Sequence, residues 1–533
     1  MKKFREERLK KVKSFIAYFA VLALLILISN PLSAYISPKK IDKLVKRAMK
    51  EFDVVGVAIV IVKNNKIYHI KGYGYKTLGK NNPVDKNTLF AIASNSKAFT
   101  TAALSILVDE GKLSWKTKVK DIIPEFRMYS PYVTENFIIE DLLTHRSGLG
   151  LGAGDLMFFP DGSNFTIDDI VKVFQYFKPV SQFRTKFDYD NLLYMVAGEV
   201  IKRVSGKSYE EFVKDRIFKP LGMNNTYANF YEVKDKTLFA TPHSKDSGKL
   251  IPIEHYTFSP EKLNGAAGGI YSCVNDLAKW LKLQLNAGKY GNGKKLFSLK
   301  NHEKMWTIHT VMPVRWSDKR YNTHFMGYGL GWMLYDAKGN MIVTHTGGLP
   351  GFLSKTIIIP DINFGMVILT NTSPGGSALF SAISKIITDS FLKLKYKDWI
   401  KVYKERTLKK SSHAKEVVRK VWETVEKNKN KKINLKNYEG LYRDRWFGTI
   451  EIKEKNGKLY FKSFRSPKLQ GDMYYYKANT FVVRWIYRDM NADAFASFCL
   501  DEKGKAVRIK MKGISPDIDF SFDFQDLDFK RVK

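Results

Sequence analysis

Two strand-rich stretches that lie far apart in the chain constrain its fold most. Residues 54–77 (VVGVAIVIVKNNKIYHIKGYGYKT) contain two β-rich runs joined by an Asn-Asn turn, which indicates a hairpin. Residues 341–372 contain three more strand-like runs, MIVTHTGG, FLSKTIIIPD and NFGMVILTNT. Helical and loop patterns dominate between the two stretches. Strands at both ends with helices inserted between them predict an α+β domain whose antiparallel sheet, flanked by helices, is built from both ends, and not repeated βαβ units.

The composition divides the chain into four parts. Residues 1–38 form an N-terminal segment of their own, and residues 39–396 carry the α+β pattern. Residues 397–436 are highly charged and weakly apolar, so we expect a partly helical linker. Residues 437–533 contain short strands and hairpin turns, such as the Asn-Gly of GTIEIKEKNGKLYFKS, which predict a small all-β barrel or sandwich.

The N-terminal segment has the pattern of an export signal. Seven basic and two acidic residues precede the apolar run SFIAYFAVLALLILI, and no charged residue occurs from Ser14 to Pro38. This hydrophobic helix is either a signal peptide, with a weak cleavage site near Ala34, or an uncleaved membrane anchor. Both interpretations predict an extracytoplasmic protein, periplasmic or at the cell surface, that is secreted or held in the membrane by this segment.

The net charge of +36 favours anionic partners such as acidic lipids, acidic wall polymers or nucleic acid. Lysines are spread along the whole chain, however, and no nucleic-acid recognition motif is present, so no specific nucleic-acid partner is expected. Two cysteines cannot form a disulfide framework or a cysteine-rich metal site. His302 and His309 do not form an H-E-x-x-H pair, so we expect no metal and no cofactor.

The stretch FAIASNSK places Ser94 three residues before Lys97, at the start of an apolar helical pattern. Positions i and i+3 share one helix face, so a neutral Lys97 could take the proton of Ser94. Lysine is neutral only when burial or nearby positive charge lowers its pKa. The simpler interpretation is that Ser94 caps the helix N-terminus. The two interpretations are compatible.

Further motifs follow in a fixed order along the chain: LLTHRSGL, YDNLLYMVAGEVI, PLGMNNT, AAGGIYSCVNDLAKW, GYGLGW and HTGGLPGF. With these motifs, the chain from about Ile41 to Tyr396 resembles the serine β-lactamase and penicillin-binding protein superfamily. The match is best with its class C-like branch, the CubicO-type hydrolases that include D-aminopeptidases and esterases. The C-terminal part, from YEGLYRDRWFGTIEIKEKNGKLYFKS to the closing DFKRV, resembles the lipocalin-like barrel that some members carry.

The resemblance implies roles for four residues of the first half of the chain. Ser94 would be the acylated nucleophile, and Lys97 would take its proton. Tyr189, in the Tyr-x-Asn element, would share the proton relay, which suits a phenol whose pKa nearby cations lower. Asn191 would hydrogen-bond Lys97 and the amide of the substrate.

The resemblance also assigns the strand motif His345-Thr346-Gly347-Gly348 to substrate binding. The backbone N–H groups of Ser94 and Gly348 would form an oxyanion hole, and the two glycines would let the strand approach a ligand closely. Class C β-lactamases have Lys-Thr-Gly here, and their lysine helps to bind the β-lactam carboxylate. A neutral histidine favours peptidase or esterase activity over efficient β-lactamase activity.

The sequence therefore predicts an exported serine hydrolase that forms an acyl-enzyme on a small peptide, amide or ester, of the D-amino-acid peptidase or esterase type. A β-lactamase or D-Ala-D-Ala carboxypeptidase acting on cell-wall-like substrates is an alternative. An alternative of another class is a non-catalytic protein that binds anionic envelope polymers. His145 and Cys273 are interpreted as structural. The role of the C-terminal domain and formation of a homo-oligomer are left open.

Overall fold

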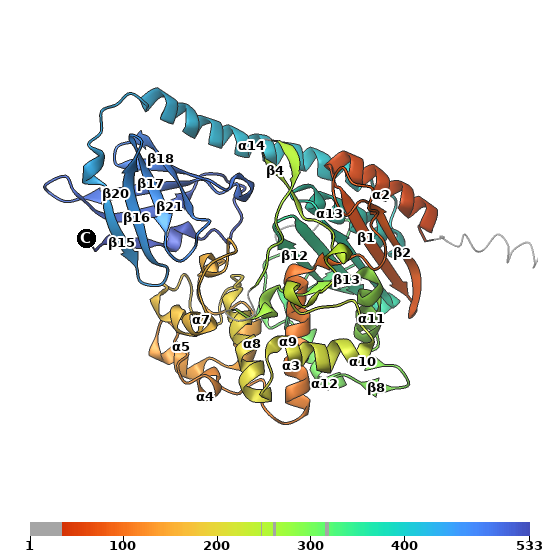
Figure 1. Cartoon of the computed structure of the whole chain (residues 1–533). Helices are drawn as coiled ribbons and strands as arrows, with labels where there is room; N and C mark the ends of the chain where they lie inside the picture. Colours follow the sequence, from red (N-terminus) through yellow and green to blue (C-terminus); the bar gives the residue numbers. More distant parts are fainter. Residues whose placement is uncertain (1–34, 247, 259–262, 315–318, 533) are drawn as a thin grey trace, which may run out of the picture.

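The computed structural model describes residues 35–246, 248–258, 263–314 and 319–532. A large domain of sheet and helices lies beside a smaller barrel, and a long helix crosses from one to the other (Figure 1). The expected N-terminal hydrophobic helix lies outside the described residues. Within those residues, no helix combines the length and the apolar character needed to cross a membrane.

The large domain is built around one eight-stranded antiparallel sheet. Its strand order is β2-β1-β14-β13-β12-β11-β10-β9, so the first two strands pair with the last ones, as the sequence predicts. The strands are β1 (Gly56–Lys63), β2 (Lys66–Gly74), β9 (Thr310–Val311), β10 (Met326–Tyr328), β11 (Met333–Ala337), β12 (Asn340–Leu349), β13 (Phe352–Ile359) and β14 (Phe364–Thr370). Short strands β3 (Phe90–Ala91) and β6 (Tyr271–Ser272) pair separately, as do β4 (His243–Asp246) with β5 (Lys249–Pro252) and β7 (Lys289–Tyr290) with β8 (Lys294–Lys295).

Both faces of the sheet are covered, because alternate side chains of a strand point to opposite faces. Val57 and Ile59 of β1 pack with helices α2 (Pro38–Phe52) and α13 (Gly375–Phe391) on one face. Ala58 and Val60 belong to the core of the other face, where α11 (Val274–Leu285) lies against β1 and β14. The strand GVAIVIVK is buried on both faces, which explains its continuous apolar sequence.

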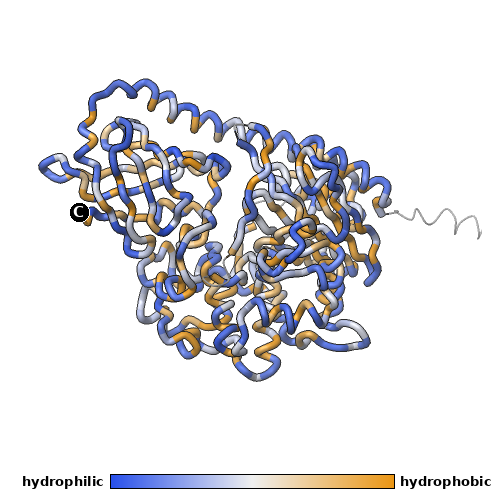
Figure 2. The backbone as a smooth tube through the Cα atoms, viewed as in Figure 1, coloured by the Kyte–Doolittle hydropathy of each residue, from blue (hydrophilic) through white to orange (hydrophobic). Residues whose placement is uncertain are grey.

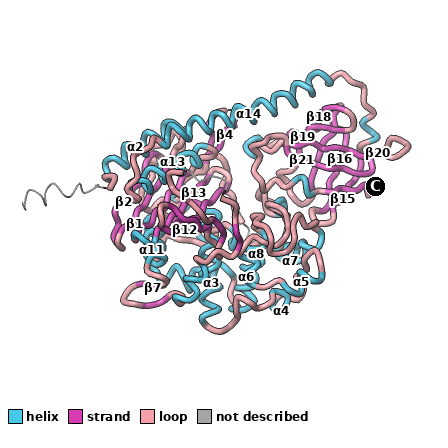
Figure 3. The backbone as a smooth tube through the Cα atoms, turned by 180° about the vertical axis from the view of Figure 1, so that it is seen from behind, coloured by secondary structure: helices cyan, strands magenta, loops and turns pink. Residues whose placement is uncertain are grey.

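A helical region occupies the chain between β2 and β9 and lies next to the sheet (Figure 3). Its two long helices, α3 (Ser96–Asp109) and α8 (Leu192–Ser205), pack against each other in the core. The shorter helices are α4 (Val119–Ile122), α5 (Pro131–Asn136), α6 (Ile139–Leu143), α7 (Ile167–Val173), α9 (Tyr209–Val213), α10 (Lys219–Leu221) and α12 (Leu299–Met305).

The charged segment after the large domain contains a single helix of 30 residues, α14 (Trp399–Asn428). Its surface is largely hydrophilic (Figure 2). Trp399 and Ile400 at its beginning are buried in the large domain, whereas Val421 and Val425 near its end pack on the barrel. The helix is therefore attached to a domain at each end.

The C-terminal domain is a closed barrel of eight antiparallel strands in sequential order, which settles the choice between barrel and sandwich. Buried aromatic and aliphatic side chains, such as Phe461, Phe481 and Trp485, fill its interior. The strands are β15 (Gly440–Asp444), β16 (Gly448–Lys455), β17 (Lys458–Ser463), β18 (Gln470–Lys477), β19 (Thr480–Trp485), β20 (Ala494–Leu500), β21 (Ala506–Gly513) and β22 (Asp528–Arg531).

Candidate active site

Ser94 lies in a tight turn between strand β3 and helix α3. A short 3-10 turn, Ala93–Asn95, precedes the helix, and Ala93 has a left-handed backbone with φ 48°. Non-glycine residues seldom adopt this conformation, which is found at functional turns. The helix begins only at Ser96, and no side-chain hydrogen bond caps it. The capping interpretation of Ser94 is therefore wrong, because Ser94 lies within the turn itself and its hydroxyl is directed to Lys97.

Lys97 is fully buried and has three oxygen neighbours. Its Nζ lies 3.2 Å from Oγ of Ser94 and 2.8 Å from Oδ1 of Asn191. The carbonyl oxygen of Ala267, in the glycine-rich AAGG turn, also lies 2.8 Å from Nζ. Three separate regions of the chain, around Ser94, Asn191 and Ala267, thus converge on one amine.

Burial lowers the pKa of Lys97 to about 7, although the nearby Asp155 and Asp190 act to raise it. Burial also raises the pKa of Asp190 to about 7 and raises that of Asp155 well above its ordinary value. An apolar surrounding disfavours every charged form, so the amine and both carboxyl groups are drawn towards neutrality together. Lys97 is consequently able to exist as a free amine near neutral pH.

The contacts of Lys97 fit a neutral amine. Such an amine has two N–H donors and one lone pair. The oxygens of Asn191 and Ala267 have no proton to give and accept the two N–H donors. The lone pair is then left for the hydroxyl of Ser94, which can donate its hydrogen. This arrangement can remove a proton from Ser94.

Tyr189 precedes helix α8, and its ring faces Lys97, with Nζ 4.8 Å from the ring centre. Burial raises the pKa of Tyr189 well above its ordinary value, and Ser94 is the neighbour that opposes this rise through hydrogen bonding. The condition stated for this phenol, a pKa lowered by nearby cations, is not met, because burial raises the pKa and the neighbouring Tyr194 and Asp155 add to the rise. The phenol oxygen is buried and has no hydrogen-bond partner among the described residues, so the neutral phenol keeps a proton that no acceptor engages.

Asn191 makes the contact with Lys97 that the family resemblance implies, and its amide has a second partner. Nδ2 of Asn191 donates to Oδ2 of Asp155 at 2.8 Å. Because a carboxyl oxygen accepts this bond, Oδ1 of Asn191 must face Lys97. Asp155 lies in the 3-10 turn Asp155–Met157. Its role is not predictable from the sequence, because a single aspartate in GAGD belongs to no recognised motif.

The strand motif lies on β12, beside the turn that carries Ser94. A Cβ added to Gly347 would meet the carbonyl oxygen of Ile92 at 2.2 Å, so glycine is required there. At Gly347, strand β12 thus approaches the turn that carries Ser94, whereas the expectation from the sequence is a close approach to a ligand. Thr346 and Gly348 are exposed on the strand, where they are accessible to a ligand.

His345 is buried and neutral, as expected. Burial, together with Lys97, lowers its pKa to about 3. Nε2 lies 2.9 Å from the hydroxyl of Tyr328, and Nδ1 lies 2.6 Å from the carbonyl oxygen of Thr346. The carbonyl requires a proton on Nδ1, so Nε2 accepts from Tyr328. His345 therefore brings no positive charge to the site.

His145 is closer to the site than the sequence indicates. Its ring lies 4.1 Å from that of Tyr189, and the backbone N–H of Asp190 donates to its Nδ1 at 3.1 Å. Burial lowers its pKa well below the ordinary value, so it is neutral. It supports the Tyr189 segment, which agrees with the structural interpretation of this residue.

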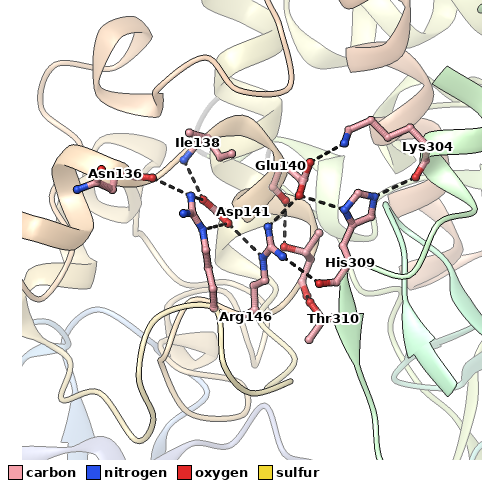
Figure 4. A network of polar contacts seen from close by, with 10 residues as sticks. Asn136, Ile138, Glu140, Asp141, Arg146, Lys304, His309 and Thr310 are labelled. Atoms are coloured by element: carbon pink, nitrogen blue, oxygen red, sulfur yellow. Dashed lines mark hydrogen bonds and ion pairs between the residues drawn. The ribbon is translucent and has the colours of Figure 1, made fainter. Parts of the chain in front are cut away.

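A network of polar contacts surrounds Glu140 and Asp141 and includes Arg146, the residue after His145 (Figure 4). Glu140 contacts Arg146 at 2.8 Å, His309 at 3.0 Å and Lys304 at 2.7 Å. Burial acts to raise the pKa of Glu140, but the hydrogen bonds from His309 and Lys304 hold it well below its ordinary value. Asp141 also contacts Arg146, at 3.2 Å. His309 thus serves a polar network, with Nδ1 3.0 Å from Oε1 of Glu140 and Nε2 3.0 Å from the carbonyl oxygen of Lys304.

The α+β fold and the Ser94–Lys97 arrangement define a class, the serine hydrolases with an S-x-x-K element. Residues 41–385 match the beta-lactamase family. The chain therefore belongs to the beta-lactamase family, and it is a serine hydrolase of that family. Residues 425–531 match a family described as a domain of unknown function, DUF3471.

Named relatives are similar over most of the chain. The unguisins hydrolase ungD' of Aspergillus campestris (strain IBT 28561) is 28% identical over 384 residues, 69% of each chain. Protein flp of Staphylococcus aureus (strain N315) is 27% identical over 342 residues, 63% of each chain.

Two solved structures have the same fold. The octameric penicillin-binding protein homologue from Pyrococcus abyssi has a TM-score of 0.58 and 24% identity, covering 92% of this chain and 99% of that one. A penicillin-binding protein from Bacillus halodurans has a TM-score of 0.52 and 23% identity, covering 64% of this chain and 99% of that one. The first likeness therefore includes the barrel as well as the large domain.

Proposed function

We propose that this serine hydrolase forms an acyl-enzyme at Ser94 and cleaves a peptide, amide or ester bond. The observation that carries the proposal is the buried amine of Lys97, whose two N–H donors are occupied and whose lone pair faces Ser94. A non-catalytic binding protein has no use for such an arrangement, because burying a lysine without a role costs stability.

The first chemical step follows from these contacts. The Ser94 proton moves to Lys97 as the serine oxygen attacks the carbonyl carbon of the substrate. The backbone N–H groups of Ser94 and Gly348 stabilise the resulting oxyanion. The carbon–nitrogen or carbon–oxygen bond then breaks, and the leaving group takes a proton from the neutral phenol of Tyr189, which Lys97 replaces.

The second step returns the enzyme to its starting state. Water attacks the acyl ester and gives up a proton to the neutral amine of Lys97. The bond to Ser94 breaks, the proton returns to its oxygen, and the carboxylic acid product is released. Asn191 keeps the Lys97 amine in place throughout, and the raised pKa of Tyr189 keeps its phenol protonated between transfers.

We place the enzyme in the class C-like branch, as a D-amino-acid peptidase or esterase. The neutral His345 supports this choice over an efficient β-lactamase or a carboxypeptidase, because these activities require recognition of a substrate carboxylate. The similarity to a relative named as a hydrolase of unguisins is consistent with an activity other than β-lactam cleavage.

Incubation of the folded protein with a fluorophosphonate, followed by mass spectrometry of the labelled peptide, tests the acyl-enzyme. We expect a single adduct on Ser94 and none in Ser94→Ala. A folded protein that stays unlabelled would refute the proposal. A screen of D-aminoacyl amides, D-Ala-D-Ala peptides, p-nitrophenyl esters and nitrocefin then identifies the bond that is cleaved.

We further propose that the protein is exported and acts outside the cytoplasm, on the strength of the basic and apolar N-terminal residues 1–38. Fractionation of the native host, with an antibody against the barrel, tests this location and whether the segment is cleaved. Recovery in the cytoplasm would contradict it.

We also propose that the C-terminal domain is a lipocalin-like barrel and that the protein assembles with itself. The sequential strand order supports the first point, and the filled interior argues against storage of a ligand there. The solved homologue from Pyrococcus abyssi is octameric, which supports the second. Light scattering after gel filtration gives the mass of the assembly, and a monomer at all concentrations would contradict self-association.

A further inference from the structure

The barrel sends one segment back to the large domain. Residues 514–527 connect strands β21 and β22 and contain the 3-10 turn Phe524–Asp526. Within this segment, residues 520–523 contact the loop of residues 148–159, which leads to the active site. The contact joins parts of the chain that are more than 360 residues apart.

Two phenylalanines anchor this segment, one to each domain. The Phe524 ring stacks on Trp485 in the barrel interior, with ring centres 5.7 Å apart. The Phe522 ring meets Phe159 of the large domain edge to face at 5.0 Å. Both phenylalanines are buried, so the segment is fixed between the two domains by apolar packing.

Asp523 binds the turn that carries Asp155. Its carboxylate oxygens accept the backbone N–H of Gly154 at 2.8 Å and that of Leu156 at 3.0 Å. These two N–H groups flank Asp155 in the chain, so Asp523 fixes the backbone on both sides of it. Asp523 is buried, and its position is determined by these bonds.

Ser521 continues the chain of contacts into the active site. Its hydroxyl donates to Oδ2 of Asp155 at 2.8 Å. The same carboxyl oxygen accepts the amide of Asn191 at 2.8 Å, and Asn191 in turn accepts Lys97 at 2.8 Å. Three consecutive hydrogen bonds thus link a hydroxyl of the barrel to the amine beside Ser94.

We propose that Ser521 is a positioning residue of the active site, which acts through Asp155 and Asn191 to orient the amine of Lys97. This inference rests on the proposed role of Lys97 as the base for Ser94. It gives the C-terminal domain an indirect part in the reaction, through two intervening side chains of the large domain.

The physical reason is the small number of partners of Asp155. Its Oδ1 has no hydrogen-bond partner among the described residues, so both side-chain donors act on Oδ2. Without Ser521 the carboxyl group can rotate, and the amide of Asn191 loses the acceptor that fixes its orientation. A turned amide would point N–H groups at Lys97, and the lone pair of the amine would no longer be held towards Ser94.

The charge on Lys97 also depends on Ser521. Loss of a hydrogen-bond donor raises the pKa of a carboxyl group, and a less charged Asp155 stabilises the ammonium form of Lys97 less. The pKa of Lys97 should therefore fall when Ser521 is removed. The titratable side chains that face Lys97 or act on this group are Asp155, Asp190, His145, His345, Tyr189 and Tyr194.

The test compares Ser521→Ala with the wild-type protein in the full chain. The readout is the rate at which a fluorophosphonate labels Ser94, measured across the pH range around neutrality. We expect the maximal rate to fall roughly 10- to 100-fold, the effect of misplacing a catalytic group. We expect the acid limb of the profile to move to lower pH. Ser497→Ala is the matched control, since it also removes one hydroxyl hydrogen bond of the barrel, at 3.0 Å to Thr480.

The same substitution made in the Asn191→Ala variant tests whether the effect of Ser521 on Lys97 passes through Asn191. In Asn191→Ala, the link between Ser521 and Lys97 is already broken, so adding Ser521→Ala should cause no further loss. A further loss of the same size in this background would overturn the proposal. A labelling rate in Ser521→Ala equal to that of the wild-type protein would also overturn it. So would a slower rate with an unchanged acid limb, because that result indicates a general loosening of the structure. If the wild-type protein itself is not labelled, it is the acyl-enzyme proposal that fails.

Discussion

The amine of Lys97 lies 3.2 Å from the hydroxyl of Ser94, and its two remaining hydrogen-bonding positions are taken by carbonyl-type oxygens. If the two residues act as one unit, the losses of activity caused by replacing each of them should not be additive. We expect Ser94→Ala and Lys97→Ala each to lower kcat/KM for a p-nitrophenyl ester by roughly 1,000-fold or more. The double variant should be within about tenfold of either single variant. An additive loss would mean that Lys97 is not the base.

The pH dependence of kcat/KM follows from the pKa of Lys97, about 7. The neutral amine is the active form, so activity should rise as the pH increases through this value. Asn191→Asp places a carboxylate next to the amine, which raises its pKa and shifts the acid limb to higher pH. The pH dependence of kcat/KM in this variant, and in Asn434→Asp as a control at an exposed position, tests the direction of this shift. A limb that moves to lower pH would contradict the assignment.

Gly347 tests the packing of β12 against the Ser94 turn. A side chain there would meet the carbonyl oxygen of Ile92 at 2.2 Å, and backbone atoms cannot move away as a flexible side chain can. We expect Gly347→Ala to displace the turn and to lower kcat roughly 100-fold. Gly150→Ala is the control, because its Cβ would be 3.6 Å from Val180, an ordinary contact. Equal activities of the two variants would refute the packing argument.

His345 tests the preference against β-lactams. His345→Lys introduces a side chain that can pair with a substrate carboxylate, so the ratio of nitrocefin to ester hydrolysis should rise, roughly tenfold. Because Tyr328 loses its acceptor, the free energy of unfolding should fall by about 1–3 kcal/mol. Tyr328→Phe is the comparison for stability, since it removes the hydrogen bond without adding charge. An unchanged ratio would show that this position does not select the substrate.

Phe520 tests whether the barrel shapes substrate choice. Its ring lies edge to face against Tyr189, with centres 5.9 Å apart, and it is 41% exposed. We expect Phe520→Ala to raise KM for esters with bulky acyl groups by roughly three- to tenfold and to change kcat little, since apolar contact area is lost. The control is Phe464→Ala, an exposed phenylalanine elsewhere on the barrel. An equal rise in KM in the control variant would show that the effect is not specific to Phe520.

The parts of the site that the sequence predicts are those with local motifs. Ser94 and Lys97 are three positions apart in the sequence. Tyr189 and His345 belong to the short motifs Tyr-x-Asn and His-Thr-Gly-Gly. The sheet was predictable for a similar reason, since the buried strand β1 is a continuous apolar run. These features depend on short-range spacing, which a single chain displays directly.

The remaining parts of the site depend on tertiary contacts. Asp155 and Ser521 are 366 positions apart, and neither belongs to a motif. The pKa of Tyr189 is raised by desolvation, which a sequence does not reveal. Helix α3 begins two residues later than the sequence pattern predicts, because the left-handed backbone of Ala93 inserts a separate turn at Ser94.

Helix α14 and the segment around Ser521 together connect the two domains twice. A helix of 30 residues is about 45 Å long, so α14 fixes the distance between its two attachment points. Because the barrel is tethered in this way, docking of its returning segment is an intramolecular event with a high effective concentration. Few contacts are then needed to keep Ser521 in place. Cutting the chain within α14 would turn the same docking into an encounter between two molecules, and the hydrolase would become dependent on the concentration of its own barrel.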